Sequence, residues 1–356
     1  MRPTERSLTR VAEVAEAPHT LSDVAKAASV SLATVDRVLN QRPGVHSRTA
    51  QKVHAAVERL NFRRDSAASR LARGTVNRLL FMLPAGNNTF MRLLGEQVAH
   101  TANLFASQRV AIDTRWVDVF DADALAQALA GIEPGYHGVA IVALDHPAVR
   151  AAVNDLVARQ VAVVTLVSDV PSSRRIRYVG IDNGAAGRTA ASLMGRFVSG
   201  RQGRIAVVMG SRSLRDHHER LFGFSQVMRE DHPQLIQLDA IEGRDNTERN
   251  AELVGELLAN HDDLIGVYNL GAGNRGIVDA LGRSGRHRDI VFIGHELTEH
   301  TRRFLLDGSM DAVIDQNPGH EARSAARVLV AHLNDEPVFD ERERIGIQIY
   351  LRDNLP

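Results

Sequence analysis

The feature that most constrains this chain is a pair of short helical segments joined by a tight turn in residues 20–40, TLSDVAKAASVSLATVDRVLN. Thr20 is placed to cap the first helix, and Asp23 completes a weaker form of the capping box. Four apolar residues then recur at i, i+3, i+4 and i+7, the period of a buried helical stripe. They are Leu21, Val24, Ala25 and Ala28.

The second segment has one face suited to packing and one that is free. Ser31 is a plausible N-cap for a helix from Leu32 to Leu39. Its inward face carries Val35, Val38 and Leu39, and its outward face carries Leu32, Ala33, Asp36 and Arg37. A third helix from about Arg48 to Leu60 covers the first two with Val53, Val57 and Leu60. This arrangement predicts a helix-turn-helix that reads the major groove of DNA; a small helical subdomain with an ordinary solvated face is the alternative.

Charge is distributed unevenly along the 356 residues, although the net charge is zero. Residues 19–74 contain 10 Lys+Arg and 4 Asp+Glu, whereas residues 75–356 contain 30 and 36. A basic head on an acidic body is expected when only the head meets phosphate.

Composition excludes several classes of protein. There is no cysteine, so disulfides and thiolate metal sites are ruled out and a reducing cytoplasm is expected. No run of 18 apolar residues exists, so we expect no membrane span. Residues 1–18 lack the apolar stretch of a secretory signal and are expected to form a flexible tail.

After Gly74 the pattern changes to apolar strand-like runs that alternate with amphipathic helical stretches. The ten runs are RLLFMLP, RVAIDTRWV, GVAIVAL, VAVVTLVSD, RYVGID, RIAVVMG, LIQLDAIE, LIGVYNLG, IVFIGHE and MDAVIDQ. Continuous apolar strands separated by helices predict parallel sheets covered on both faces. Ten strands exceed one comfortable sheet. We therefore expect an α/β body of two doubly wound subdomains, with ligand residues at the carboxyl ends of the strands.

These residues resemble the lactose-repressor (LacI/GalR) family of bacterial transcription regulators. The resemblance spans Thr20 to Pro356 and rests on the helix-turn-helix signature and the following RPGVHSRTAQKVHAAVERLNF. The body is similar to periplasmic sugar-binding proteins of the ribose-binding type, in RYVGIDNGAAGRTAA, ERLFGF and AVIDQNP. The resemblance implies a helix-turn-helix domain over 19–64, a hinge helix over 65–74 and an effector-binding and dimerisation domain over 76–356. The chain is expected to cross between subdomains near 180 and 316.

By position, the resemblance implies which residues of the head meet DNA. Leu32, Ala33 and Arg37 would face base edges, and Arg37 is suited to a bidentate contact with guanine, although a phosphate contact is its alternative role. Ser31, Thr34, Ser47 and Thr49 would contact phosphates, or act only as caps. Asp36 stands where the family usually has serine, which affects the operator sequence rather than DNA binding itself.

DSAASRLARG looks like the family's hinge helix. Leu71 would insert between base steps in the minor groove, and Ala68 would pack against its dimer mate. Such a short helix needs DNA and a partner to form, which makes it a switch; a linker helix that only spaces two domains is the alternative. Two heads per dimer would read a pseudo-palindromic operator.

Six residues of the body match the sugar-binding pattern: Phe90, Asp169, Arg220, Asn274, Glu296 and Gln316. Carboxylates accept from hydroxyls, Arg and Asn donate, and an aromatic ring covers C–H groups, which suits a small sugar or polyol. Each alone could be a solvated loop residue or a cap. Glu296 replaces the family's usual aspartate. Asp145, His146 and His295 also end strands and rank behind these six.

Enzymatic readings are weak. GxSxG, HExxH and P-loop motifs are absent, and the third glycine of GAGNRG falls at the wrong spacing for a dinucleotide site. The paired His217 and His218 diverge on a helix and have no third ligand, so loop histidines are the better account.

The sequence thus predicts a cytoplasmic, homodimeric, ligand-controlled repressor without catalytic residue, metal or cofactor. A sugar-binding receptor that does not act on DNA and a sugar-processing enzyme are the alternatives.

Overall fold

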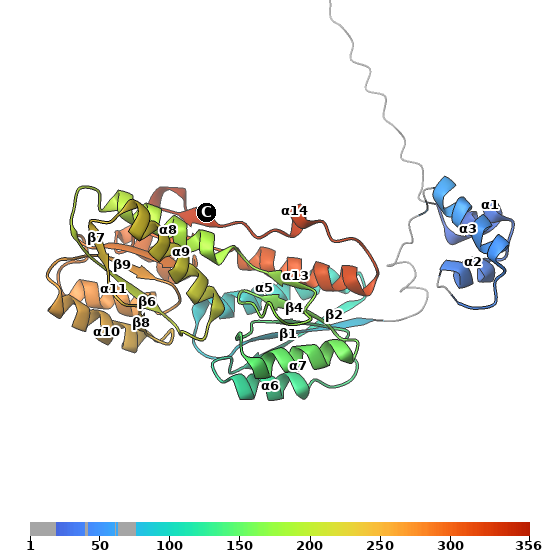
Figure 1. The fold of residues 1–356 in the computed structure, drawn as a ribbon, viewed down its shortest axis with the longest axis horizontal. Helices are drawn as coiled ribbons and strands as arrows, with labels where there is room; N and C mark the ends of the chain where they lie inside the picture. The colour runs from blue at the N-terminus through green and yellow to red at the C-terminus, as the bar shows by residue number, and fades with distance from the viewer. Residues whose placement is uncertain (1–18, 40–41, 61, 63–75) are drawn as a thin grey trace, which may run out of the picture. The chain divides into compact units, whose positions relative to one another are not determined.

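The computed structural model describes residues 19–39, 42–60, 62 and 76–356 (Figure 1). The chain forms two compact units, Met1–Thr75 and Val76–Pro356, called here the head and the body. The predicted flexible tail over 1–18 and the predicted hinge helix over 65–74, with Ala68 and Leu71, lie outside the described residues.

The head contains the three predicted helices, α1 (Leu21–Ala28), α2 (Leu32–Leu39) and α3 (Ser47–Arg59). Thr20 and Asp23 form the predicted capping box: the Thr20 hydroxyl accepts from the Asp23 amide, and the Asp23 carboxylate accepts from the Thr20 amide at 2.8 Å. Ser31 accepts from the Thr34 amide at the start of α2. Helix α3 begins at Ser47, one residue earlier than predicted, after His46 as N-cap.

One valine from each helix is completely buried in the core of the head: Val24, Val35 and Val53. Ala25, Ala28, Val38 and Ala56 complete the buried cluster, and Val57 and Leu60 pack against it. The periodicity therefore identified the packing faces correctly, although Ala56 was not among the predicted residues.

The body begins with a five-stranded parallel sheet in the order β2-β1-β3-β4-β5. Its strands are β1 (Asn77–Pro84), β2 (Val110–Val117), β3 (Gly138–Ile141), β4 (Ala162–Leu166) and β5 (Arg177–Val179). Its helices are α5 (Thr89–Ala106), α6 (Ala122–Ala130), α7 (Pro147–Ala158), α13 (Pro318–Leu333) and α14 (Asp340–Glu343). We call this group of elements the N-terminal lobe.

The second sheet has seven strands in the order β12-β11-β10-β9-β6-β7, with β8 also paired to β6. Its strands are β6 (Gly203–Met209), β7 (Leu235–Gln237), β8 (Ile241–Glu242), β9 (Leu264–Asn269), β10 (Val291–His295), β11 (Ala312–Asp315) and β12 (Gln348–Tyr350). Its helices are α8 (Asn183–Phe197), α9 (Arg215–Asp231), α10 (Thr247–Asn260), α11 (Asn274–Arg283), α12 (Glu299–Asp307) and the short η1 (Arg352–Asn354). This is the C-terminal lobe.

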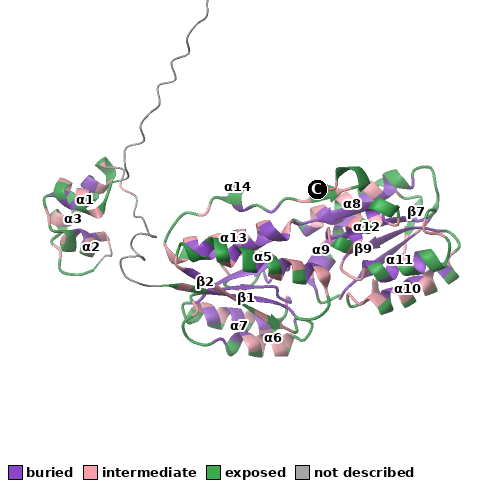
Figure 2. Ribbon diagram, turned by 180° about the vertical axis from the view of Figure 1, so that it is seen from behind, coloured by how far each residue is buried: buried purple, intermediate pink, exposed green. Residues whose placement is uncertain are grey.

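Helices cover both faces of each sheet, as expected for parallel strands that are apolar throughout (Figures 1 and 2). On β1, Leu80 and Met82 pack with α6 and α7, whereas Leu79 and Phe81 face the core that holds α5 and α13. In the C-terminal lobe, α8 and α9 lie on one face and α10, α11 and α12 on the other. The predicted fold class is confirmed.

The chain passes between the lobes three times. It leaves β5 and enters α8 at residues 180–182, returns from β11 to α13 at residues 316–317, and passes from α14 to β12 at residues 344–347.

All ten predicted strand-like runs contain strands, but two details differ. LIQLDAIE is broken into β7 and β8 by residues 238–240, and β12, the only antiparallel strand among the described residues, was missed. None of the helices within the described ranges combines the length and the apolar character needed to cross a membrane.

Candidate functional site

The outward face of α2 is solvent-exposed in the described part of the head. Leu32 keeps 53% of its surface exposed. Ser31, Ala33, Arg37 and Ser47 are also exposed, and Thr34 and Thr49 are half-buried. The face therefore offers one arginine and one apolar side chain with several short hydroxyls around them.

Several polar side chains near this face have partners within the head. The Ser31 and Thr34 hydroxyls lie within hydrogen-bonding distance of each other, 2.8 Å apart, at the start of α2. Asp36, the departure from the family pattern, forms an ion pair with Arg42 at 3.4 Å, which offsets the charge that it would present to a phosphate.

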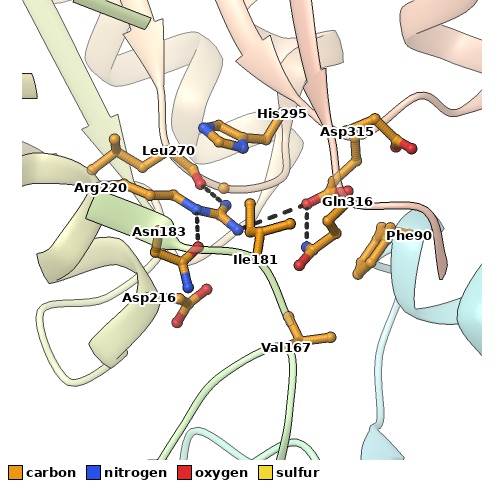
Figure 3. Close-up of polar contacts among 12 residues, drawn as sticks. Phe90, Val167, Ile181, Asn183, Asp216, Arg220, Leu270, His295, Asp315 and Gln316 are labelled. Atoms are coloured by element: carbon orange, nitrogen blue, oxygen red, sulfur yellow. Dashed lines mark hydrogen bonds and ion pairs between the residues drawn. The ribbon is translucent and has the colours of Figure 1, made fainter. Parts of the chain in front are cut away.

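A cavity of about 210 Å³ opens between the two lobes of the body, at the carboxyl ends of the strands. Four of the six predicted ligand residues line it: Phe90, Arg220, Glu296 and Gln316. Phe90 stands in the first turn of α5, Arg220 on α9, and Glu296 and Gln316 directly after β10 and β11. These residues come from both lobes and from a crossing segment (Figure 3).

Arg220 is the organising charge of the cavity and only 2% exposed. Its Nε donates to Asn183 Oδ1 at 2.8 Å, and its Nη1 donates to the Leu270 carbonyl at 2.7 Å (Figure 3). Burial works against its charge, but nearby Asp216 and Glu296 raise its pKa overall. The guanidinium is therefore fixed in place and charged, and its Nη2 has no hydrogen-bond partner among the residues that the structure describes.

Glu296 and Gln316 form a buried pair beside this guanidinium. Gln316 Nε2 donates to Glu296 Oε1 at 2.7 Å, and Arg220 Nη2 lies 4.0 Å from the same oxygen. Burial, and then the nearby Asp315, raise the pKa of Glu296 to about 8. The carboxyl is thus mostly protonated at neutral pH, and its contact with Arg220 is a charge–dipole contact rather than a full ion pair.

Two predicted ligand residues do not line this cavity. Asp169 is held by Arg175, whose Nη2 donates at 2.5 Å, and by the Thr165 hydroxyl at 2.5 Å. Strand β4 ends at Leu166, so Val167 and Ser168 occupy the wall where Asp169 was expected. Asn274 lines a smaller adjoining cavity of about 50 Å³. Its side-chain Oδ1 accepts a hydrogen bond from Asn269 Nδ2, and its Nδ2 donates to the His295 carbonyl.

The lower-ranked candidates have structural partners. Asp145 bonds Arg150 within its lobe and Arg215 across the cleft at 3.3 Å. His146 caps α7. His295 Nε2 bonds the Tyr268 hydroxyl at 2.8 Å, and burial, together with Arg220, holds the pKa of His295 well below its usual range. A second contact across the cleft joins Asn88 Nδ2 to Asp245 Oδ2 at 3.4 Å.

The expectation of loop histidines was wrong. His217 and His218 lie in the first turn of α9, and His217 is buried beneath the β6–α9 loop, where its Nδ1 accepts from the Gly210 amide at 3.1 Å. Sequence reasoning also missed Asp216, which lines the cavity. Its position four residues before Arg220 places both on one face of a helix, and this spacing could have identified it.

Comparison with known proteins now gives the family. Residues 79–337 match the periplasmic binding protein domain, and residues 20–65 match the lacI family of bacterial regulatory proteins. The chain belongs to the periplasmic binding protein domain family. Its head matches the lacI family over residues 20–65, so both parts of the resemblance predicted from sequence are confirmed.

Two curated relatives match the chain over different lengths. Catabolite control protein A of Priestia megaterium is 36% identical over 86 residues, 24% of this chain and 26% of that protein. The chain thus spans about a quarter of the length of this relative. The HTH-type transcriptional regulator DegA of Bacillus subtilis is 24% identical over 239 residues, 67% of this chain and 69% of that protein.

Solved structures share the fold of the body. A solute binding protein from Burkholderia graminis in complex with D-arabinose superposes with a TM-score of 0.71 at 20% identity, over 78% of this chain and 96% of that one. GanP, a glucose-galactose binding protein from Geobacillus stearothermophilus, superposes with a TM-score of 0.70 at 20% identity, over 79% and 99%.

Proposed function

We propose that this chain is a LacI-type regulator: a homodimeric repressor that binds a pseudo-palindromic operator and is controlled by a small sugar-like effector in the cavity of the body. The observation that carries the effector part of the proposal is a set of five buried polar atoms, all on residues that line the cavity, without hydrogen-bond partners among the described residues. They are Ser168 Oγ, Asp216 Oδ1, Arg220 Nη2, Glu296 Oε2 and Gln316 Oε1.

Leaving a buried polar group unpaired costs about 1–3 kcal/mol. Five such groups around one cavity therefore indicate a polar ligand that pairs with them. Arg220 Nη2 and the protonated Glu296 can donate, whereas Asp216 Oδ1 and Gln316 Oε1 can only accept. Hydroxyl groups both donate and accept, so a ligand with several hydroxyls satisfies the whole set, and Phe90 can cover its C–H face.

The cavity is also connected to the crossing segments. Arg220 bonds Asn183, the first residue of α8 after the first crossing, and Asn183 Nδ2 donates to the Tyr178 hydroxyl at 3.1 Å. Gln316 lies in the second crossing itself. A ligand held by Arg220 and Gln316 therefore acts on two crossings at once. A shift of one lobe against the other is a common way to couple a ligand site to a DNA-binding site, and the coupling free energy between two such sites is typically about 1–3 kcal/mol.

In the head, Arg37 is the side chain proposed to read a base. Full-length protein and its Arg37→Ala variant are to be titrated, by fluorescence anisotropy, with duplexes from upstream of its own gene and with random duplexes. Arg229→Ala, at an exposed position on α9, is the matched control. We expect R37A to lose about 10-fold or more of the discrimination between the two DNAs, from 1–3 kcal/mol per bidentate contact, while R229A retains it.

Equal discrimination by R37A and the unchanged protein would refute the role of Arg37. Failure of the unchanged protein to bind any duplex at low salt would refute the regulator itself and favour the receptor alternative. True operator binding should weaken steeply as salt rises, because phosphate contacts release counterions. The regulator is proposed to act in the cytoplasm, where its DNA lies, and without enzymatic turnover.

A further inference from the structure

The two lobes contribute very different surfaces to the cavity. In the N-terminal lobe the side chains that follow β2, β3 and β4 are apolar: Val119, Phe120, Val142 and Val167. Phe90 and Met91 of α5 extend the same surface. We call these six residues the apolar wall, and Figure 3 shows Phe90 and Val167 of this wall near the polar side chains of the C-terminal lobe.

Polar groups are scarce on the N-terminal side. Of its lining side chains only Asn87, Asn88 and Ser168 are polar. Asn87 is exposed, and Asn88 caps α5 through Oδ1 and bonds Asp245 through Nδ2. Ser168 Oγ is therefore the one buried side-chain atom of this lobe that can pair with a ligand at the cavity, against four from the C-terminal lobe and the second crossing.

The backbone of Val167, in the apolar wall, is held in a conformation that valine disfavours. Its φ of 64° lies in the left-handed region, which β-branched residues rarely adopt and which costs on the order of 1–3 kcal/mol. The backbone is fixed on both sides, because the Val167 amide donates to the Val179 carbonyl at 3.1 Å and its carbonyl accepts from the Tyr178 hydroxyl at 2.9 Å. The strained turn places an apolar side chain on the wall.

We propose that the effector is a single-ring deoxy sugar; this inference rests on the function proposed above. The methyl group of the deoxy sugar forms one apolar edge, which lies against the apolar wall. A hydroxyl group against the apolar wall would lose its hydrogen bonds to water and gain no protein partner in return. A methyl group there has no hydrogen bonds to lose, and its apolar surface is removed from water. The cavity of about 210 Å³ lies below the range of about 300–1,000 Å³ typical of drug-sized ligands, which fits one ring.

The test compares sugars that differ only at this group, by isothermal titration calorimetry on the full-length protein. The matched pairs are D-galactose with D-fucose, L-galactose with L-fucose, L-mannose with L-rhamnose, and D-glucose with D-quinovose. We expect the deoxy member to bind about 10-fold more tightly in the pair whose ring stereochemistry fits. If the hydroxylated member of the tightest pair binds equally well or better, the proposal is overturned.

Variants of the wall test the same point through the protein. Val167→Thr keeps the branched shape and adds a hydroxyl at the wall, so we expect it to reduce the preference for the deoxy sugar about 5-fold or more. Phe120→Gln is a second variant at a position that is 45% exposed, where folding is not at risk. Val278→Thr, half-buried on α11 and remote from the cavity lining, is the matched control and should leave the preference unchanged.

The outcomes separate this inference from the proposed function. Salt-sensitive operator binding that is released by hydroxylated sugars as well as by deoxy sugars would leave the regulator intact and overturn only the apolar-edge effector. If no sugar of any pair binds at millimolar concentration, the sugar effector falls and the deoxy sugar falls with it. An unchanged preference in both V167T and F120Q would show that the wall does not select the methyl group.

Discussion

Replacing Glu296 by glutamine tests the electrostatics of the cavity directly. Glutamine has nearly the shape of a protonated glutamate but cannot ionise. The folded-state pKa of about 8 is far above the ordinary 4.5, so the folded protein holds a proton that the unfolded chain releases. Stability from this group is therefore fully present below pH 4.5 and is lost as pH rises from 4.5 to 8.

The size of the effect follows from the same numbers. At 1.36 kcal/mol per pH unit, the interval between 4.5 and about 8 corresponds to about 5 kcal/mol at pH 8 and above, and to about 3 kcal/mol at pH 7. We expect Glu296→Gln to match the unchanged protein near pH 4.5 and to exceed its free energy of unfolding by these amounts at higher pH. The variant keeps the partner of Gln316 Nε2, because its own amide oxygen can accept.

The assay is urea unfolding followed by circular dichroism, from pH 4.5 to 9. Asp315 and Glu321 also have pKa values raised first of all by burial, and the pKa of Glu321 is raised further by Glu296. The difference between the two proteins therefore reports on Glu296 together with its coupling to Glu321. Glu299→Gln makes the same change at an exposed position on α12 and is the matched control. Parallel profiles for E296Q and the unchanged protein would refute a protonated Glu296.

Two further predictions concern packing and the cleft. A Cβ at Gly187 would lie 2.0 Å from the Arg220 carbonyl oxygen, so we expect Gly187→Ala to lower the free energy of unfolding by about 1–3 kcal/mol. A Cβ at Gly255 would have nothing within 4 Å, so Gly255→Ala, the control, should raise the free energy of unfolding by about 0.5–1 kcal/mol. Equal effects of the two variants in urea unfolding would argue against a close contact between α8 and α9 at Gly187. Arg215→Ala breaks two partly exposed ion pairs, with Asp145 across the cleft and with Glu219 at 2.8 Å within α9, and should cost less than about 2 kcal/mol. A loss of several kcal/mol that Glu219→Ala does not reproduce would show that the contact with Asp145 holds the lobes together.

The head was predictable almost to the residue, because its signals are local. A cap, an i, i+4 stripe and a turn lie within a few residues of one another, and Thr20, Asp23 and Val24 have the contacts that these patterns imply. Strand β12 carried no such signal. It is three residues long, and only its pairing with β11, more than thirty residues earlier in the chain, makes it a strand.

The ligand residues were harder to predict, because a strand end is visible in sequence only to within a few residues. Asp169 follows an apolar run that continues past the end of β4, and the turn at Val167 moves its carboxylate to Arg175. Asn274 does follow a strand end, but pattern alone does not say which of two adjoining cavities it lines. In contrast, Glu296 and Gln316 come directly after strands that end where expected.

The most buried acid of the body lies close in sequence to the second crossing, whose Gln316 lines the cavity. Glu321 lies in the first turn of α13, fully buried, and both of its oxygens lack hydrogen-bond partners among the described residues. Burial first, and then Glu296, raise its pKa well above the usual range, so a charge on either carboxyl opposes ionisation of the other. In the proposed regulator, an effector hydroxyl that pairs with Glu296 would change this interaction at the start of α13, directly after the second crossing, and a contact with Arg220 would act on the first crossing through Asn183. A ligand that engages only Arg220 should therefore bind without moving the lobes as a complete effector does.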